Sequence, residues 1–175
     1  MHDRGLLEAM ATLPAEEFSG QVFRATRKGL DPLAPSSYGG RWSAPKGQAV
    51  LYTSFEWAGA LKELSYHWAQ QIPIPNKPIL VHTLRVHTGR TLRLRRTTLE
   101  TLGLGDAAFR GDDVSRMQEI GEAAGFLEFD GLIVPSVRYD CDNLIIFSAN
   151  SGPGAGLFQV ISSDEVNDWG KLPDE

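Results

Sequence analysis

The fold is decided by residues 38 to 64, which read YGGRWSAPKGQAVLYTSFEWAGALKEL. The paired glycines at the start of this stretch predict a loop, and Ala49–Thr53 reads as a short apolar strand. The remainder predicts a helix that runs to about Gln70. A Thr-x-x-Glu box, formed by Thr53 and Glu56, predicts where this helix begins.

Three side chains in this stretch are suited to handling a nucleotide: Arg41 on the loop, Tyr52 on the strand and Glu63 on the helix. An arginine beside glycines can offer a fork of donors to a phosphate, although a mobile surface loop explains the same residues equally well. The ring of Tyr52 can stack on a planar base or can simply pack in the core. Glu63 borders the apolar stripe of the helix and can therefore point into a cleft. That stripe consists of Trp57, Ala60, Leu61, Leu64 and Trp68.

The composition predicts a single α+β domain that spans residues 1–175. A chain of 175 residues with 42% hydrophobic residues can bury a core of its own. The net charge of -5 argues against a protein whose main task is to hold nucleic acid, because that affinity rests on neutralising phosphates. The lone Cys141 allows neither an internal disulfide nor a cysteine-rich metal site. We expect a cytoplasmic protein with no membrane segment, because no apolar run approaches about 20 residues.

The remaining elements follow from periodicity and breakers. The alternation of apolar and polar residues predicts five further strands: Gln21–Thr26, Ile79–His87, Asp130–Ser136, Asn143–Ser148 and Leu157–Ile161. Helical spacing predicts three further helices: Asp3–Leu13, Thr97–Leu104 and Val114–Ala124. A second capping box, Ser162 with Glu165, predicts a last short helix that reaches Trp169. Strands interspersed with helices in this way are typical of an α+β fold.

Several charged residues outside the central stretch have more than one reading. Arg24 lies on a predicted strand, where a surface ion pair is the more ordinary interpretation. The four arginines within Arg90–Arg96 favour a solvated strand edge over a patch for an acidic partner. His67 follows Glu63 by one helical turn, but no third ligand stands at matching spacing, so we expect no metal site.

Taken together, several segments resemble the RES-domain family, which is named for its arginine, glutamate and serine. In chain order these segments are Arg24, Tyr38–Trp42, Leu51–Ser54, Ala60–Glu63, Gly131–Ser136 and Asn143–Leu144. The similarity covers about residues 23–147. Each segment alone is a weak signal, but their order and spacing together are more specific. It implies an ADP-ribosyltransferase-like fold with a mixed β-sheet core. It also implies the toxin half of an Xre–RES toxin–antitoxin pair.

The resemblance also implies roles for individual residues. Glu63, Arg41 and Tyr52 are the expected catalytic set, and Arg24, Ser136 and Tyr38 join Arg41 and Tyr52 in binding NAD, the substrate. Glu63 would stabilise the positive charge that develops on the ribose, and the two guanidinium groups would hold the pyrophosphate. Ser136 would hydrogen-bond the nicotinamide end or the adjacent ribose. Residues 84–116 and the segment from 151 onward match no part of the family pattern that we can quote.

Three functions are compatible with these implications. The leading one is a toxin that cleaves the nicotinamide–ribose bond of NAD by hydrolysis or phosphorolysis, which depletes NAD and arrests growth. An alternative is an ADP-ribosyltransferase that modifies a protein through the same site. A third, of another class, is a non-catalytic nucleotide-binding module. The resemblance further implies a hetero-oligomer with an Xre-type antitoxin that blocks the NAD site. From the net charge of -5 we expect no direct contact of this chain with nucleic acid.

Overall fold

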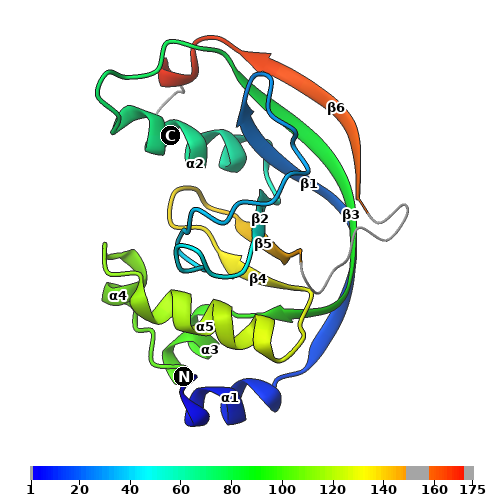
Figure 1. The fold of residues 1–175 in the computed structure, drawn as a ribbon, viewed down its shortest axis with the longest axis vertical. Coiled ribbons are helices and arrows are strands. Elements are labelled where there is room, and N and C mark those ends of the chain that lie inside the picture. Colours follow the sequence, from blue (N-terminus) through cyan, green and yellow to red (C-terminus); the bar gives the residue numbers. More distant parts are fainter. Residues whose placement is uncertain (1, 149–157, 172–175) are drawn as a thin grey trace.

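The computed structural model describes residues 2–148 and 158–171. It has a six-stranded mixed sheet with flanking helices, which confirms the predicted α+β class (Figure 1). In chain order the elements are α1 (Arg4–Ala11), β1 (Ala15–Arg27), β2 (Val50–Ser54), α2 (Trp57–Ala69), β3 (Ile79–Arg93), α3 (Arg96–Thr101), α4 (Asp106–Arg110), α5 (Ser115–Phe126), β4 (Gly131–Pro135), β5 (Asp142–Phe147), β6 (Phe158–Val166) and the 3₁₀ turn η1 (Trp169–Lys171).

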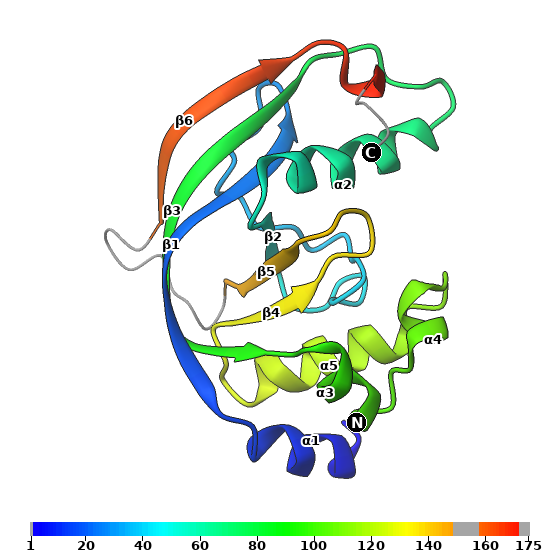
Figure 2. The same ribbon diagram turned by 180° about the vertical axis from the view of Figure 1, so that it is seen from behind.

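Two long strands, β1 and β3, curve along one side of the molecule, as Figure 2 shows from behind. They pair antiparallel over their whole length. Strand β6 pairs antiparallel with the first part of β3, and β4 runs parallel to its last residues. Both long strands extend well beyond the predicted ranges, because hydrogen bonding to a neighbour carries them through residues that lack an apolar alternation.

The short strands β2, β5 and β4 complete the sheet. They pair antiparallel in that order, and β1 meets β2 where Phe23 lies opposite Ser54. Since β1 also pairs with β3, the strands β1, β2, β5, β4 and β3 form a ring of pairings. Four of the five residues of β4 are buried, as expected for a strand covered on both faces.

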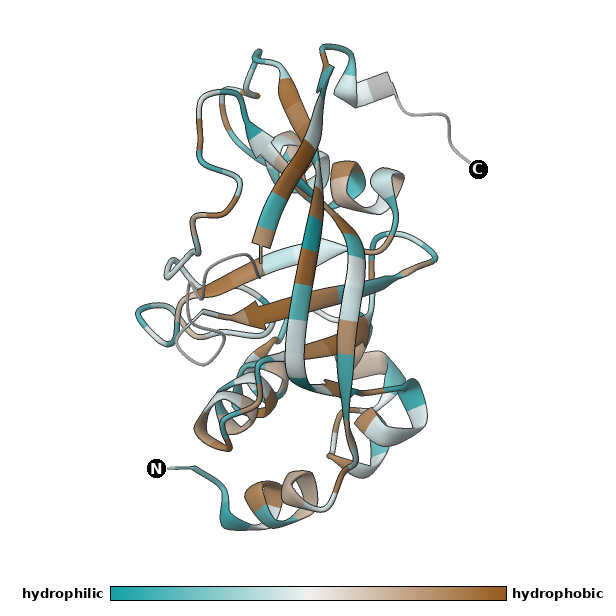
Figure 3. Cartoon of the chain, turned by 90° about the vertical axis from the view of Figure 1, so that its right-hand side faces the viewer, coloured by the Kyte–Doolittle hydropathy of each residue, from teal (hydrophilic) through white to brown (hydrophobic). Residues whose placement is uncertain are grey.

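The helices divide between the two ends of the sheet. Helix α2 packs its buried face, which includes Leu61 and Trp68, against Ile79 and Val81 of β3. Helices α1, α3, α4 and α5 gather at the other end around a second core (Figure 1). Brown and teal residues alternate along the long curved strands in Figure 3, which is the pattern of strands with one side toward a core. The space between the two helical groups contains β2, β5, β4 and the loop 28–49 (Figures 1 and 2).

Both predicted capping boxes are wrong. Thr53 is buried in β2, and its hydroxyl donates to the carbonyl of Leu144 in β5 at 2.8 Å. The hydroxyl is therefore not available to cap the helix. Helix α2 begins at Trp57, and its N-cap residue Glu56 makes no side-chain cap. The second box, from Ser162 to Glu165, lies inside β6, where pairing with β3 overrides the local helical signal. The predicted strand Leu157–Ile161 corresponds to the start of β6, but its first residue, Leu157, lies outside the described residues.

The arginines of the run Arg90–Arg96, which spans the end of β3 and the start of α3, make several intramolecular contacts. Arg93 forms ion pairs with Glu16 at 2.9 Å and Asp142 at 3.4 Å, and Arg96 pairs with Asp106 of α4 at 2.6 Å. This part of β3 is flanked by both β1 and β4, so the expectation of a solvated strand edge is wrong. Helix α4 itself was not predicted. Among the described residues, no helix is long and apolar enough to cross a membrane.

Candidate active site

A cavity of about 440 Å³ opens between α2, the strands β1, β2 and β5, and the loop 28–49. We call it the Glu63 pocket. Four of the predicted site residues line it: Arg24, Arg41, Tyr52 and Glu63. Two do not. Tyr38 is 93% exposed, and Ser136 bonds Glu63 without lining the pocket itself.

Glu63 is held in place through one oxygen of its carboxylate. Its Oε1 accepts hydrogen bonds from the hydroxyl of Ser136 at 3.0 Å and from the side-chain amide of Asn143 at 3.2 Å. The second oxygen, Oε2, accepts none from the residues that the structure describes. Side chains from β5 and from the turn after β4 thus fix the carboxylate on α2, and one oxygen stays available to a ligand.

The hydroxyl of Ser136 is fully engaged. A serine hydroxyl has one donor and two acceptor positions. It donates to Glu63, and it accepts from the backbone amides of Arg138 at 3.1 Å and Tyr139 at 3.3 Å. Its contacts therefore favour a role in orienting Glu63 over the predicted contact with nicotinamide or ribose, which stays untested.

Arg24 carries an unsatisfied donor into the pocket. Its Nη2 donates to the carbonyl of Ala34 at 3.1 Å, whereas its Nη1 is buried without a partner. Burial lowers the pKa of Arg24 to about 10, and the charge of Asp31 opposes that shift, so the guanidinium stays charged at neutral pH. In the described part of the chain, one other buried side-chain atom lacks a partner, and it is Oδ1 of Asn143. Both residues line the Glu63 pocket.

Arg41 is tied to the protein more closely than Arg24. Its Nη1 donates to the carbonyl of Phe109 at 3.1 Å, and its Nη2 donates to that of Gly111 at 3.3 Å. These carbonyls belong to the end of α4, which attracts a cation. Burial lowers the pKa of Arg41, as does the charge of Arg138, while Glu63 raises it. Arg41 therefore anchors the loop to α4 while it lines the pocket.

Tyr52 holds the same loop from the other side. Its hydroxyl accepts from the backbone amide of Trp42 at 3.3 Å and bonds the hydroxyl of Ser43 at 3.1 Å. A Cβ on Gly40 would lie only 2.6 Å from this hydroxyl, so the close approach requires glycine. Burial raises the pKa of Tyr52. The expected stacking of its ring on nicotinamide stays a prediction.

Sequence reasoning assigned no role to two residues, Asn143 and Arg138, that affect the groups of this pocket. Asn143 was part of the matched pattern, but its contact with Glu63 arises only when β5 and α2 come together. Arg138 lies on the turn after β4, and its charge lowers the pKa of both Arg41 and His67. His67 had a sequence signal, its spacing from Glu63, and it does line the pocket, where burial lowers its pKa and Glu63 raises it.

The predicted absence of a metal stays a prediction. Within residues 2–148 and 158–171, no three His, Cys, Asp or Glu side chains are grouped as a metal site would require.

Comparison with known proteins gives a family match and a structural neighbour. The sequence model of the RES domain family matches residues 20–168. This range extends beyond residues 23–147, over which the sequence showed the resemblance. The NAD(+) phosphorylase MbcT of Mycobacterium tuberculosis (strain H37Rv) is 28% identical over 143 residues, which cover 77% of this chain and 76% of that protein. MbcT of Mycobacterium bovis gives the same values. The crystal structure of the M. tuberculosis MbcT–MbcA toxin–antitoxin complex superimposes with a TM-score of 0.82 at 24% identity, covering 94% of this chain and 93% of its counterpart.

Proposed function

The chain belongs to the RES domain family, and on that premise we propose that it cleaves the nicotinamide–ribose bond of NAD in the Glu63 pocket. Its relative MbcT is an NAD(+) phosphorylase, which supports this choice of substrate. We propose that the chain acts as the toxin of a toxin–antitoxin pair in the cytoplasm, where the loss of NAD arrests growth.

The observation that carries the proposal is the set of unused polar groups around one fixed carboxylate. Glu63 keeps Oε2 available, Arg24 keeps Nη1 and Asn143 keeps Oδ1. Buried polar atoms are normally satisfied within the protein, so unsatisfied ones gathered in one cavity point to a ligand. NAD can supply a pyrophosphate to Arg24, a hydrogen-bond donor to Asn143 and, as the bond breaks, a ribose that develops positive charge beside Glu63.

The chemistry follows from this arrangement. Cleavage of the bond places positive charge on the ribose in an oxocarbenium-like transition state. A carboxylate already fixed beside that sugar stabilises the charge without having to reorganise during the reaction. The leaving nicotinamide already carries a positive ring, so it departs as a neutral molecule and needs no proton from the enzyme. Arg24 and Arg41 would hold the pyrophosphate, and Ser136 and Asn143 would orient Glu63.

The release of nicotinamide from NAD tests the proposal. We expect Glu63→Gln to reduce the rate by about 10³-fold, because the amide keeps the shape of the side chain but loses the charge that stabilises the transition state. Glu56→Gln is the matched control, since Glu56 is exposed at the start of the same helix and makes no side-chain cap. Equal rates for the wild type and Glu63→Gln, or no nicotinamide release by the wild type, would contradict the assignment.

Mass spectrometry of the second product then identifies the acceptor. ADP-ribose indicates hydrolysis, ADP-ribose phosphate indicates phosphorolysis, and a mass increase on a protein indicates ADP-ribosylation.

We further propose that an antitoxin of the Xre type binds this chain and covers the Glu63 pocket. The structural neighbour was solved as a toxin–antitoxin complex, which supports a partner of this kind. The product of the reading frame next to this gene is the candidate to co-express. We expect the purified complex to release no nicotinamide, and a complex that keeps full activity would contradict the blocking of the pocket.

A further inference from the structure

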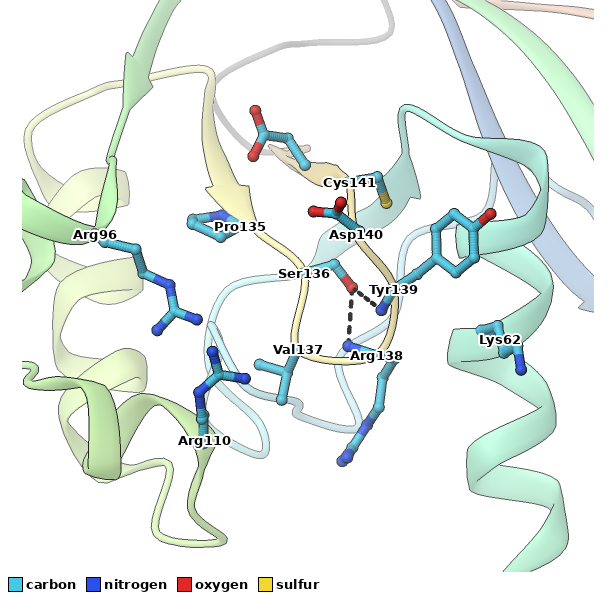
Figure 4. Close-up of a pocket in the computed structure, with 11 residues that line it drawn as sticks. Lys62, Arg96, Arg110, Pro135, Ser136, Val137, Arg138, Tyr139, Asp140 and Cys141 are labelled. Carbon is cyan, nitrogen blue, oxygen red and sulfur yellow. Dashed lines mark hydrogen bonds between the residues drawn. The ribbon is translucent and has the colours of Figure 1, made fainter. Parts of the chain in front are cut away.

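The turn between β4 and β5, residues 136–141, lines a second cavity of about 700 Å³ (Figure 4). The turn is closed on itself, because the backbone amide of Ser136 donates to the carbonyl of Cys141 at 2.8 Å. Dashed lines in Figure 4 mark the bonds from the backbone amides of Arg138 and Tyr139 to the hydroxyl of Ser136. The orientation of that hydroxyl therefore depends on the conformation of the whole turn.

Three residues on one face of α2 lie against this turn. Gly59, Glu63 and Tyr66 follow one another at intervals of four and three residues, which places them on the same side of the helix. Their partners in the turn are, in the same order, Cys141, Ser136 and Arg138. The helix and the turn are thus joined at three points. The carboxylate of Glu63 is the middle point, and it is where the second cavity meets the Glu63 pocket.

The two outer contacts differ in kind. At Gly59 an added Cβ would lie only 2.7 Å from Sγ of Cys141, so this close approach requires glycine. At the other end the guanidinium of Arg138 packs over the ring of Tyr66, with Cζ 3.4 Å from the ring centroid. This cation–π contact lies at the surface, because Tyr66 is 37% exposed. Removal of the ring should therefore loosen one end of the joint without opening the core.

We propose that Tyr66 and Arg138 are positioning residues for the cleavage of NAD. Their stacked contact holds the turn against α2, and the turn keeps the hydroxyl of Ser136 on the carboxylate of Glu63. This inference rests on the proposed cleavage of NAD and adds residues that touch no reacting atom. If the turn moves away from α2, the bond to the carboxylate weakens. The carboxylate must then reorient during the reaction, which lowers the rate.

The variant Tyr66→Leu tests this proposal, because it removes the ring and leaves the charge of Arg138 in place. We expect kcat for nicotinamide release to fall about threefold to fivefold, the size of one cation–π contact at an exposed site, and KM for NAD to stay within about twofold. Tyr66→Phe keeps the ring and should give a kcat within about 1.5-fold of the wild-type value. Phe126→Leu is the matched control, since it removes an exposed ring from α5 and lines neither cavity.

A double-mutant cycle shows whether Tyr66 acts through Ser136. Once Ser136→Ala has removed the donor to Glu63, the turn no longer reaches the carboxylate through that bond. Tyr66→Leu should then lower kcat by less than about 1.5-fold further, whereas two independent effects would multiply. The proposal is overturned if the whole loss persists in the Ser136→Ala background. It is also overturned if Tyr66→Leu leaves kcat unchanged, with or without a rise in KM for NAD.

Arg138→Met removes the other partner of the same contact and keeps an unbranched side chain. Tyr66 also contacts the ring of His67, and this second variant leaves that contact intact. It should give the same fall in kcat, and it serves as the test if thermal unfolding shows that Tyr66→Leu does not fold. A rise in KM for NAD with kcat unchanged in Arg138→Met would mean that Arg138 binds the substrate directly, which contradicts a positioning role.

Hydrogen exchange separates a failure of this proposal from a failure of the proposed function. If the wild type releases no nicotinamide, the proposed function fails, but the backbone amides of Arg138 and Tyr139 still report on the turn, because both donate to Ser136. We expect both amides to exchange at least about threefold faster in Tyr66→Leu than in the wild type and in Tyr66→Phe. Equal exchange rates would show that the stacked contact does not hold the turn.

Discussion

The Glu63 pocket and the cationic groove, which is the neighbouring cavity of about 700 Å³ lined by Lys62, Arg96, Arg110 and Arg138, hold their charged groups in different ways. In the pocket, the carboxylate of Glu63 and the guanidinium of Arg41 are each fixed by two or more hydrogen bonds. In the groove, Lys62 and Arg138 are free of ion pairs within the described part of the chain. Fixed groups suit a reaction in which charge must be stabilised at one point, and unpaired cations give a cavity a general positive potential.

The charged residues of the two cavities also differ in their effect on the stability of the folded state. The buried Nη1 of Arg24 lacks a hydrogen-bond partner, and the charge of Asp31 offsets only part of the effect of burial. Such a group destabilises the folded state and is retained where a ligand needs it. Groove cations stay accessible to water and cost little. Substitutions in the pocket should therefore produce the larger effects on activity, together with a gain in stability at Arg24.

After the substitution of Glu63 itself, the largest effect is expected at Arg24. We predict that Arg24→Met lowers kcat/KM for NAD about 100-fold, because it removes a charge-assisted contact to the pyrophosphate. The same change should raise the free energy of unfolding by about 1 kcal/mol, since an apolar side chain replaces a buried unpaired charge. Steady-state kinetics and urea unfolding measure the two quantities. Arg27→Met, at the exposed end of β1, is the control. A variant that is less stable and equally active would contradict this contrast between the cavities.

A smaller effect is expected at Ser136, where the two cavities meet. Ser136→Ala removes the donor to Oε1 of Glu63, so the carboxylate loses part of its fixed orientation. We predict that kcat falls about tenfold while KM for NAD changes little, because the loss concerns positioning in the transition state. Ser136→Thr keeps a hydroxyl and should restore most of the activity.

Ser148→Ala serves as a control for the loss of a hydroxyl. It removes a hydroxyl that bonds a backbone carbonyl at the end of β5 and lines neither cavity. A rise in KM for NAD in Ser136→Ala with kcat unchanged would indicate that Ser136 binds the substrate directly.

The sequence predicted the elements that carry their own apolar pattern. Helix α2, with Trp57 to Trp68 at helical spacing, and the short strands β2, β4 and β5 lie within a residue or two of their expected ranges. The second half of β3 and helix α4 were missed. Both depend on partners distant in the chain, such as the pairing of Ala15 with Leu92, and no local window contains that information.

The residues of the candidate site could be predicted, but the contacts between them could not. Residue type and family pattern singled out Arg24, Arg41, Tyr52 and Glu63, and these line one pocket. What could not be predicted is which donor meets which acceptor. The engagement of Ser136 with Glu63 depends on how the turn after β4 packs against α2, and the anchoring of Arg41 depends on the unpredicted helix α4. Hydrogen bonds between elements follow from tertiary packing rather than from spacing in the chain.

The smallest effect is expected at Tyr52, and it separates two ways in which the pocket could use this residue. Burial raises the pKa of Tyr52, so its hydroxyl stays protonated at neutral pH, and it is already bonded to Trp42 and Ser43. Tyr52→Phe keeps the ring for stacking and removes only the contacts to the loop. We therefore predict a loss of about 1 kcal/mol in the free energy of unfolding and a change in kcat/KM of less than about threefold.

Thermal unfolding and nicotinamide release measure both effects of Tyr52→Phe, and Tyr52→Leu, which also removes the ring, gives the comparison. If the ring stacks on nicotinamide, Tyr52→Leu should raise KM for NAD well beyond the value for Tyr52→Phe, because an aromatic contact is lost in addition to the hydroxyl. A loss of about 100-fold in Tyr52→Phe alone would place the hydroxyl in the chemistry. The pocket would then depend on the hydroxyl of Tyr52 as closely as it depends on the guanidinium of Arg24.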